Sequence, residues 1–200
     1  MKRTAPVSHP IHDIIADRHS PRCFSGRPID AKTLASLFEA ARWAPSSFNE
    51  QPWRFIIATQ TDKEAFDRIL DLLSPGNQGW AQTAAVLGVS VAKKTITRNG
   101  QPNRHAFHDV GLASALMAAQ ATAQGMGMHM MGGFDQERAR TELKIPEDYE
   151  PVTAFALGYP EAPENMPDSE RKRFEAPRER KPLADMLFLG SWERPFEGLP

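Results

Sequence analysis

The sequence has little of what marks several common protein classes. Its 200 residues contain one cysteine, Cys23, which excludes an intramolecular disulfide and a cysteine-rich zinc or iron–sulfur site. The 24 lysines and arginines nearly balance the 25 aspartates and glutamates. The resulting net charge of -1 provides no overall field that would recruit nucleic acid or an anionic membrane. We therefore expect neither nucleic acid nor a membrane as a partner.

Long apolar runs are also missing. Residues 1–15 are broken by Pro6, His9, Pro10 and Asp13, so they lack the apolar core of a signal peptide. No stretch approaches the roughly 20 apolar residues that a membrane-spanning helix requires. Together with the single cysteine, these absences predict a soluble, cytoplasmic protein.

What is present is a globular composition, 40% hydrophobic and 24% charged, in a chain as long as one ordinary domain. Residues 74–79 and 93–104 are predicted loops, and the proline-rich, charged tail after Tyr159 is predicted to be an arm lying on another surface. Helices mixed with buried strands around one central helix predict a three-layer α+β domain. The predicted helices are residues 9–17, Asp30 to a stop at Ala44-Pro45, 62–73, 107–124 and 136–143; the predicted strands are residues 55–58, 84–92, 127–131 and 152–157.

The first candidate site is the basic turn Arg-His-Ser-Pro-Arg at residues 18–22. Two guanidinium groups four positions apart, with the Ser20 hydroxyl between them, suit a phosphate monoester, because arginine gives charge-assisted hydrogen bonds to phosphate oxygens. A second basic segment, residues 178–183, would add charge to such a site. For each segment taken alone, a solvated turn or a solvated run of charge is the commoner explanation.

The second candidate is the loop at residues 43–53, where serine, asparagine and glutamine stand between two prolines and two tryptophans. Amides beside apolar rings suit a polar heteroaromatic ligand, although a proline-punctuated turn whose tryptophans cap the core is the alternative. Glycines at 125, 127, 132 and 133 form a third feature. They would let the backbone approach a flat ring closely, or simply form a helix C-cap and a turn.

Five motifs follow one another along the chain. They are Arg-His-Ser-x-Arg-x-Phe from residue 18, Ala-Arg-Trp-Ala-Pro-Ser-Ser-x-Asn-x-Gln-Pro-Trp from 41, His-Asp-Val-Gly-Leu-Ala from 108, Gly-Gly-Phe-Asp from 132 and Arg-Lys-Pro-Leu from 180. In this order they resemble the nitroreductase family. The similarity runs from about Ile11 to Leu187, and it implies a nitroreductase-like fold with a mainly antiparallel central sheet flanked by helices, in an intertwined homodimer with FMN at its interface. It also implies one domain over residues 1–200, whose arm, about 160–200, packs on the partner subunit.

The resemblance also implies which residues bind FMN. One group would hold the phosphate and ribityl oxygens, a loop from the partner subunit would complete the site, an amide would face the flavin pyrimidine, and a glycine segment would lie under the isoalloxazine with a backbone N–H near N5. Some members have an acidic residue where this chain has Gly132. This difference puts in doubt whether the chain binds the nicotinamide cofactor and selects substrates as those members do. The residues are, in that order, Arg18, His19, Ser20, Arg22 and Arg180; Pro45, Ser46, Ser47, Asn49 and Gln51; Asn77; and Met131, Gly132 and Gly133.

The implied activity is an FMN-dependent NAD(P)H oxidoreductase that reduces nitroaromatic, quinone or similar small electrophilic acceptors by ping-pong hydride transfer through flavin N5. The flavin carries the chemistry, so no catalytic side chain is assigned. The alternatives are a flavin storage or sensing protein, a specialised enone or aldehyde reductase, and a structural dimer without cofactor.

Three further hypotheses have less support from the residues. A metal at His105, His108 and Asp109 lacks further ligands, and Asp109 is expected to turn away from the two histidines. Cys23 is expected to be a packed cysteine rather than a nucleophile. The basic residues of the 93–104 loop are expected to be solvated, with the phosphate of NADPH as the alternative ligand.

Overall fold

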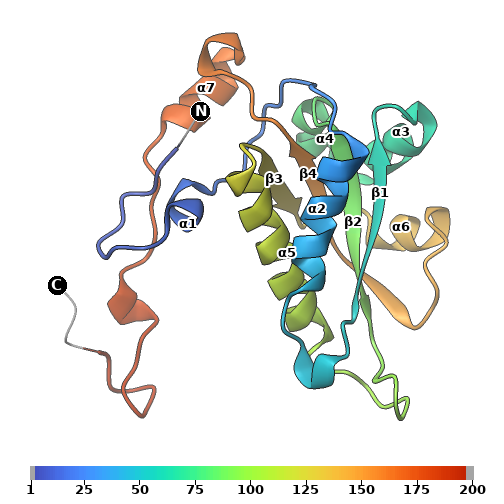
Figure 1. Ribbon diagram of the computed structural model, residues 1–200, viewed down its shortest axis with the longest axis vertical. Helices are drawn as coiled ribbons and strands as arrows, with labels where there is room; N and C mark the ends of the chain where they lie inside the picture. Colours follow the sequence, from blue (N-terminus) through green and yellow to red (C-terminus); the bar gives the residue numbers. More distant parts are fainter. Residues whose placement is uncertain (1–2, 197–200) are drawn as a thin grey trace.

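The computed structural model describes residues 3–196 and has a four-stranded sheet between two layers of helices (Figure 1). All strand pairs are antiparallel and the strand order is β1-β2-β4-β3. This arrangement confirms the predicted three-layer α+β fold, and each predicted strand is found. The strands are β1 (Trp53–Thr59), β2 (Val86–Lys93), β3 (Gly127–Met131) and β4 (Tyr149–Gly158).

The two faces of the sheet carry separate hydrophobic cores. Helices α2 (Ala31–Arg42) and α5 (Ala106–Ala123) cover one face, and α3 (Lys63–Leu72), α4 (Pro75–Ala81) and α6 (Gln136–Glu142) lie on the other (Figure 1). Side chains of β2 alternate between the two cores, with Val86 in the first and Leu87 in the second. A strand covered on both faces explains why β2 is apolar except at Ser90 and at its last residue, Lys93.

Local sequence accounts for the ends of the first helical layer. Helix α2 begins after Asp30, whose carboxylate accepts a hydrogen bond from the Thr33 amide at 2.9 Å. Helix α5 ends before Gly125, which has the positive φ of 71° that glycine adopts without strain. Both ends agree with the prediction.

Two predicted elements were wrong. The first helix is shorter than residues 9–17, because the His12 side chain caps α1 (Asp13–Asp17), and Pro10 lies outside it. The predicted loop at 74–79 lies largely within helix α4, which tolerates Gly76 and Gly79 because Pro75 occupies its first turn and the buried Trp80 anchors it.

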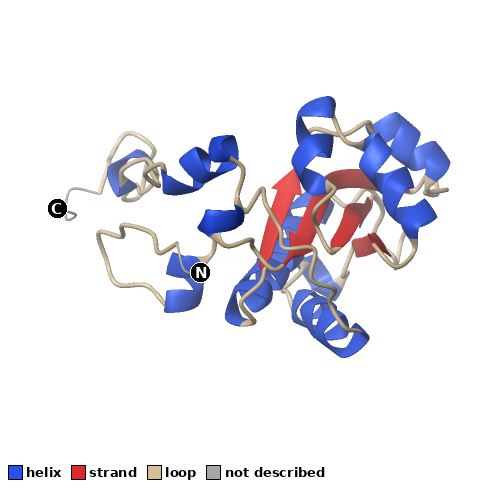
Figure 2. Cartoon of the chain, turned by 90° about the horizontal axis from the view of Figure 1, so that it is seen from above, coloured by secondary structure: helices blue, strands red, loops and turns tan. Residues whose placement is uncertain are grey.

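The two terminal segments lie together, to one side of the layered body, in both views (Figures 1 and 2). Helix α7 (Asp168–Glu175) and the 3₁₀ turn Leu183–Asp185 belong to this C-terminal arm, whose last four predicted residues, 197–200, lie outside the described part. Arg178 ties the segments together by donating to the carbonyl oxygens of Ala16 at 2.8 Å and Arg18 at 2.7 Å. The arm is therefore fixed to the chain next to the predicted phosphate-binding turn.

Gly88 in β2 gives a test of this packing. A Cβ at this position would lie 2.4 Å from the fully buried Phe155 ring and 2.8 Å from the Ile56 carbonyl oxygen. We expect Gly88→Ala to lower the free energy of unfolding by about 1–3 kcal/mol, the usual cost of overpacking a core, as measured by urea denaturation. The control is Gly79→Ala in α4, where a Cβ meets nothing within 4 Å, and an equal loss there would contradict the explanation.

Candidate functional site

The turn at residues 18–22 lies against α4 and the start of β3. Pro21 packs on Gly127, where a Cβ would come within 2.5 Å of the proline ring, and the Pro21 carbonyl oxygen lies 3.0 Å from His129 Nδ1. The Arg22 guanidinium donates to the Gly76 carbonyl oxygen at 3.2 Å and lies over the Trp80 ring, 5.3 Å from its centroid. The turn is thus fixed to the body by its second half.

The first half of the turn carries a concentration of positive charge. Burial and the nearby charge of Arg180 lower the pKa of Arg18. Burial, followed by the charges of Arg18, Arg3 and Arg180, likewise lowers the pKa of Arg178, which Asp17 partly offsets. Over residues 3–196, no carboxylate forms an ion pair with Arg18 or Arg180. Guanidinium groups that repel one another without a paired carboxylate form a site whose electrostatic complement is an anion such as phosphate.

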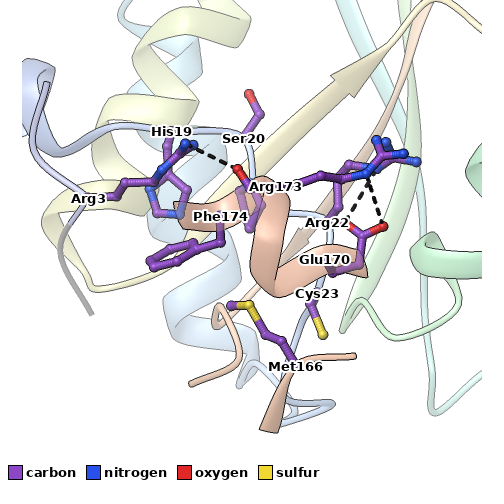
Figure 3. Close-up of a pocket in the computed structure, with 10 residues that line it drawn as sticks. Arg3, His19, Ser20, Arg22, Cys23, Met166, Glu170, Arg173 and Phe174 are labelled. Atoms are coloured by element: carbon purple, nitrogen blue, oxygen red, sulfur yellow. Dashed lines mark hydrogen bonds and ion pairs between the residues drawn. The ribbon is translucent and has the colours of Figure 1, made fainter. Parts of the chain in front are cut away.

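A cavity of about 220 Å³ lies between the turn at residues 18–22 and helix α7 (Figure 3). The His19 ring lies edge-on to Phe174, whereas the Ser20 side chain points away from α7. Glu170 of α7 approaches Arg22, with Oε2 4.0 Å from Nε. Ser20 therefore projects away from α7, while the His19 ring lies on the α7 side of the turn.

Asn77 and the glycine segment form the next part of the site. The Asn77 amide donates to the Gly133 carbonyl oxygen at 3.1 Å, and Gly133 leaves no room for a side chain, since a Cβ would lie 2.8 Å from Ser74 Oγ. Gly132 and Gly133 are exposed, whereas the Met131 side chain is buried in the core. This segment can offer backbone groups to a ligand next to a side-chain amide.

The loop at residues 45–51 is compact and strained. Three of its non-glycine residues have positive φ angles, 52° at Phe48, 56° at Asn49 and 48° at Gln51. Its ends are joined by a 3.0 Å hydrogen bond from the Gln51 amide to Ser46 Oγ. Phe48 is 73% exposed, and the Arg98 guanidinium lies over its ring. Left-handed backbone at bulky residues is costly and is concentrated at functional sites.

The predicted site residues fall into two groups within one chain. The turn at 18–22, Asn77, the glycine segment and the basic arm form one group near Gly127, just beyond the end of α5. The loop at 45–51 forms the other group, beside the first turn of α5. Because α5 has 18 residues, it spans about 27 Å between them. The loop accordingly lies at the bottom of Figure 1, away from α4 and the turn.

The geometry gives little support to a reactive thiol at Cys23 or to a metal site. Burial, and then the charges of Glu161 and Glu170, raise the pKa of the Cys23 thiol, which disfavours the reactive thiolate. Over residues 3–196, no group of three or more histidine, cysteine, aspartate or glutamate side chains is placed to hold a metal ion. The same range includes no helix long and apolar enough to cross a membrane.

Sequence reasoning missed the role of Asp109. Rather than turning away from both histidines, its carboxylate lies 2.9 Å from His108 Nδ1, and it also accepts a 3.0 Å hydrogen bond from the Ser47 amide. The signal was an acidic residue in the first turn of a largely apolar helix, but its partner is 62 residues away in the chain. Arg178 was likewise noted only as part of a basic segment, although it anchors the arm.

Comparison with known proteins identifies the class. The model of the nitroreductase family matches residues 15–159, and the chain belongs to this family. A solved structure described as an oxidoreductase containing FMN is 35% identical, with a TM-score of 0.88 over 96% of this chain and 98% of that one. An NADH dehydrogenase of Thermus thermophilus is 28% identical over 72% of this chain and 83% of its own. A nitrobenzene nitroreductase of Ectopseudomonas oleovorans is 25% identical over 82% and 92%.

Proposed function

We propose that this chain reduces small electrophilic acceptors, nitroaromatic compounds or quinones among them, with electrons from NADH or NADPH. As a member of the nitroreductase family it is an NAD(P)H-dependent oxidoreductase with FMN as its cofactor. When bound, FMN supplies the hydride chemistry. The chain's own residues bind and orient the cofactor and shape the space in which an acceptor is reduced.

The observation that carries this proposal is the cluster of arginines at the predicted phosphate site. Arg18, Arg178 and Arg180 converge, and burial together with their mutual charge lowers the pKa of Arg18 and Arg178. A phosphate dianion would relieve that repulsion, and the Ser20 hydroxyl would add a neutral hydrogen bond. We assign the phosphate to Arg18, Ser20 and Arg180, with Arg22 bracing the turn against α4.

The remaining assignments follow the geometry around that cluster. Asn77 and the exposed backbone at Gly132 and Gly133 offer the amide and main-chain groups that a flavin ring edge requires. At Gly132, where a Cβ would meet nothing within 4 Å, the absence of a side chain lets a flat ring lie close to the backbone. Gly132 also adds no acidic group near the nicotinamide.

We further propose a homodimer with shared sites. The loop at 45–51 is about one length of α5 from the arginine cluster of its own chain, so a second subunit would have to supply it. Exposed apolar side chains support such an interface: Ile15 on α1, and Phe107 and Leu116 on α5. Apolar surface of this kind usually marks a contact surface.

The arm is proposed to pack on the partner subunit. Several of its apolar side chains are exposed within the single chain: Leu183, Met186, Leu187, Leu189 and Trp192, the last of which is 81% exposed. An arm that extends away from its own body, with exposed leucine, methionine and tryptophan, is suited to contact a second copy. Cytoplasmic location stays a prediction from the single cysteine.

An absorbance spectrum of the purified protein tests the central proposal. We expect flavin bands that bleach when NADPH or NADH is added without oxygen, because reduction of the flavin removes its visible absorbance. A protein that shows no flavin band, even after incubation with FMN, would contradict the proposal. Bands that never bleach would instead favour flavin storage or sensing.

A further inference from the structure

The structure assigns Asp109 a role that the proposed function does not include: we propose that Asp109 is a positioning residue, which holds the loop at 45–51 in the conformation that completes the partner's flavin site. The inference rests on the proposed shared site. The proposed role requires no contact between Asp109 and the cofactor. It acts through the main chain of Ser47.

The contact is buried and specific. Asp109 is only 2% exposed, and a buried carboxylate is costly unless its oxygens are hydrogen-bonded. Both oxygens have partners: Oδ2 accepts from the Ser47 amide at 3.0 Å, and Oδ1 lies 2.9 Å from His108 Nδ1. The first turn of α5 adds the favourable field of a helix N-terminus. Asp109 is therefore a fixed acceptor at the base of the loop.

The loop needs such an anchor because its backbone is strained. Ser47 directly precedes Phe48 and Asn49, two non-glycine residues with φ angles of 52° and 56°. Conformations of this kind persist only where surrounding contacts determine them. The exposed side of the loop is also held, because the Glu50 carboxylate accepts from the Thr97 amide at 2.8 Å. Asp109 supplies the buried contact that complements it.

Loss of the Asp109 contact would change the conformational order of the loop at 45–51, not the chemistry of the reaction. Without the Ser47 contact, the loop is expected to relax toward ordinary backbone angles, and Asn49 would no longer be presented in one orientation. Binding FMN would then require the loop to be ordered at the same time, which lowers affinity. Loss of Asp109 should thus weaken cofactor binding from a residue that makes no cofactor contact.

The test compares Asp109→Ala and Asp109→Asn in the full-length protein. Asparagine keeps an oxygen that can accept from the Ser47 amide, whereas alanine keeps none. We expect Asp109→Ala to speed hydrogen exchange at the Ser47 amide and to raise the Kd for FMN at least about ten-fold, as the loss of a charge-assisted hydrogen bond predicts. Asp109→Asn keeps the hydrogen bond without its charge, so it should bring the exchange rate and the Kd part of the way back to the wild-type values. If Asp109→Ala does not fold, Asp109→Ser replaces it, since its hydroxyl is too short to reach Ser47.

A control separates positioning from general stability. Ser90 is equally buried, and its hydroxyl bonds Thr153 within the sheet, so Ser90→Ala removes a buried hydrogen bond that has no partner in the loop. We expect Ser90→Ala to lower Tm without changing the Kd for FMN. The proposal is overturned if a folded Asp109→Ala protein binds FMN like the wild type, or if Ser90→Ala weakens FMN binding equally. Exchange at Ser47 tests the anchor even if the wild type binds no FMN, a result that would overturn the proposed function instead.

Discussion

Replacing Arg18 by alanine should weaken FMN binding by about ten-fold to a hundred-fold. This range corresponds to the roughly 1.5–3 kcal/mol of a charge-assisted hydrogen bond, with about 1.4 kcal/mol for each factor of ten in Kd. Burial and the charge of Arg180 lower the pKa of Arg18, so we expect a bound phosphate to interact more strongly with it than with a solvated arginine. The Kd is measured by quenching of FMN fluorescence on titration with flavin-free protein.

The matched control for Arg18→Ala is Arg68→Ala. Arg68 lies on α3 and pairs with Glu64 on the exposed surface, so this variant makes the same change in net charge away from the cluster. It should leave the Kd unchanged. If Arg18→Ala purifies with a full complement of flavin, the phosphate site has been assigned to the wrong residues.

Subunits carrying different mutations should restore activity to one another. In a shared site, Arg18 and Asn49 of the same chain belong to different flavins, so a mixed dimer of Arg18→Ala and Asn49→Ala keeps one intact site. Random mixing makes half the dimers mixed, and about a quarter of all sites are then intact. We expect each variant alone to be strongly impaired, and the mixture, unfolded and refolded together, to recover about a quarter of wild-type turnover with NAD(P)H and a quinone.

Asn49→Gly controls for the backbone in this experiment. Asn49 has φ of 56°, which asparagine and glycine tolerate better than alanine, so Asn49→Ala both removes an amide and adds strain. If Asn49→Gly were fully active, the amide side chain would not be needed. If the mixture gave no recovery although mixed dimers formed, the shared site would be wrong.

Local sequence predicted most of the elements correctly. The Asp30 cap, the stop at Ala44-Pro45 and the positive φ of Gly125 depend on residues within a few positions, so they could be read in order along the chain. The apolar run of β2 similarly predicted a strand covered on both faces. The prediction of a loop at residues 74–79 was wrong. Two glycines favour a loop locally, but burial of Trp80 stabilises a helix there.

The sequence by itself determined the fold class, the family and the residue types of the candidate site, because periodicity, caps and motif order are written in neighbouring positions. Only the tertiary structure decided how those residues are grouped. It brought Arg178 onto Arg18 across 160 positions, and it buried Asp109 against Ser47. It also separated the 45–51 loop from the phosphate turn by the length of α5. Such pairings depend on chain topology and on which faces exclude water, and no local pattern specifies them.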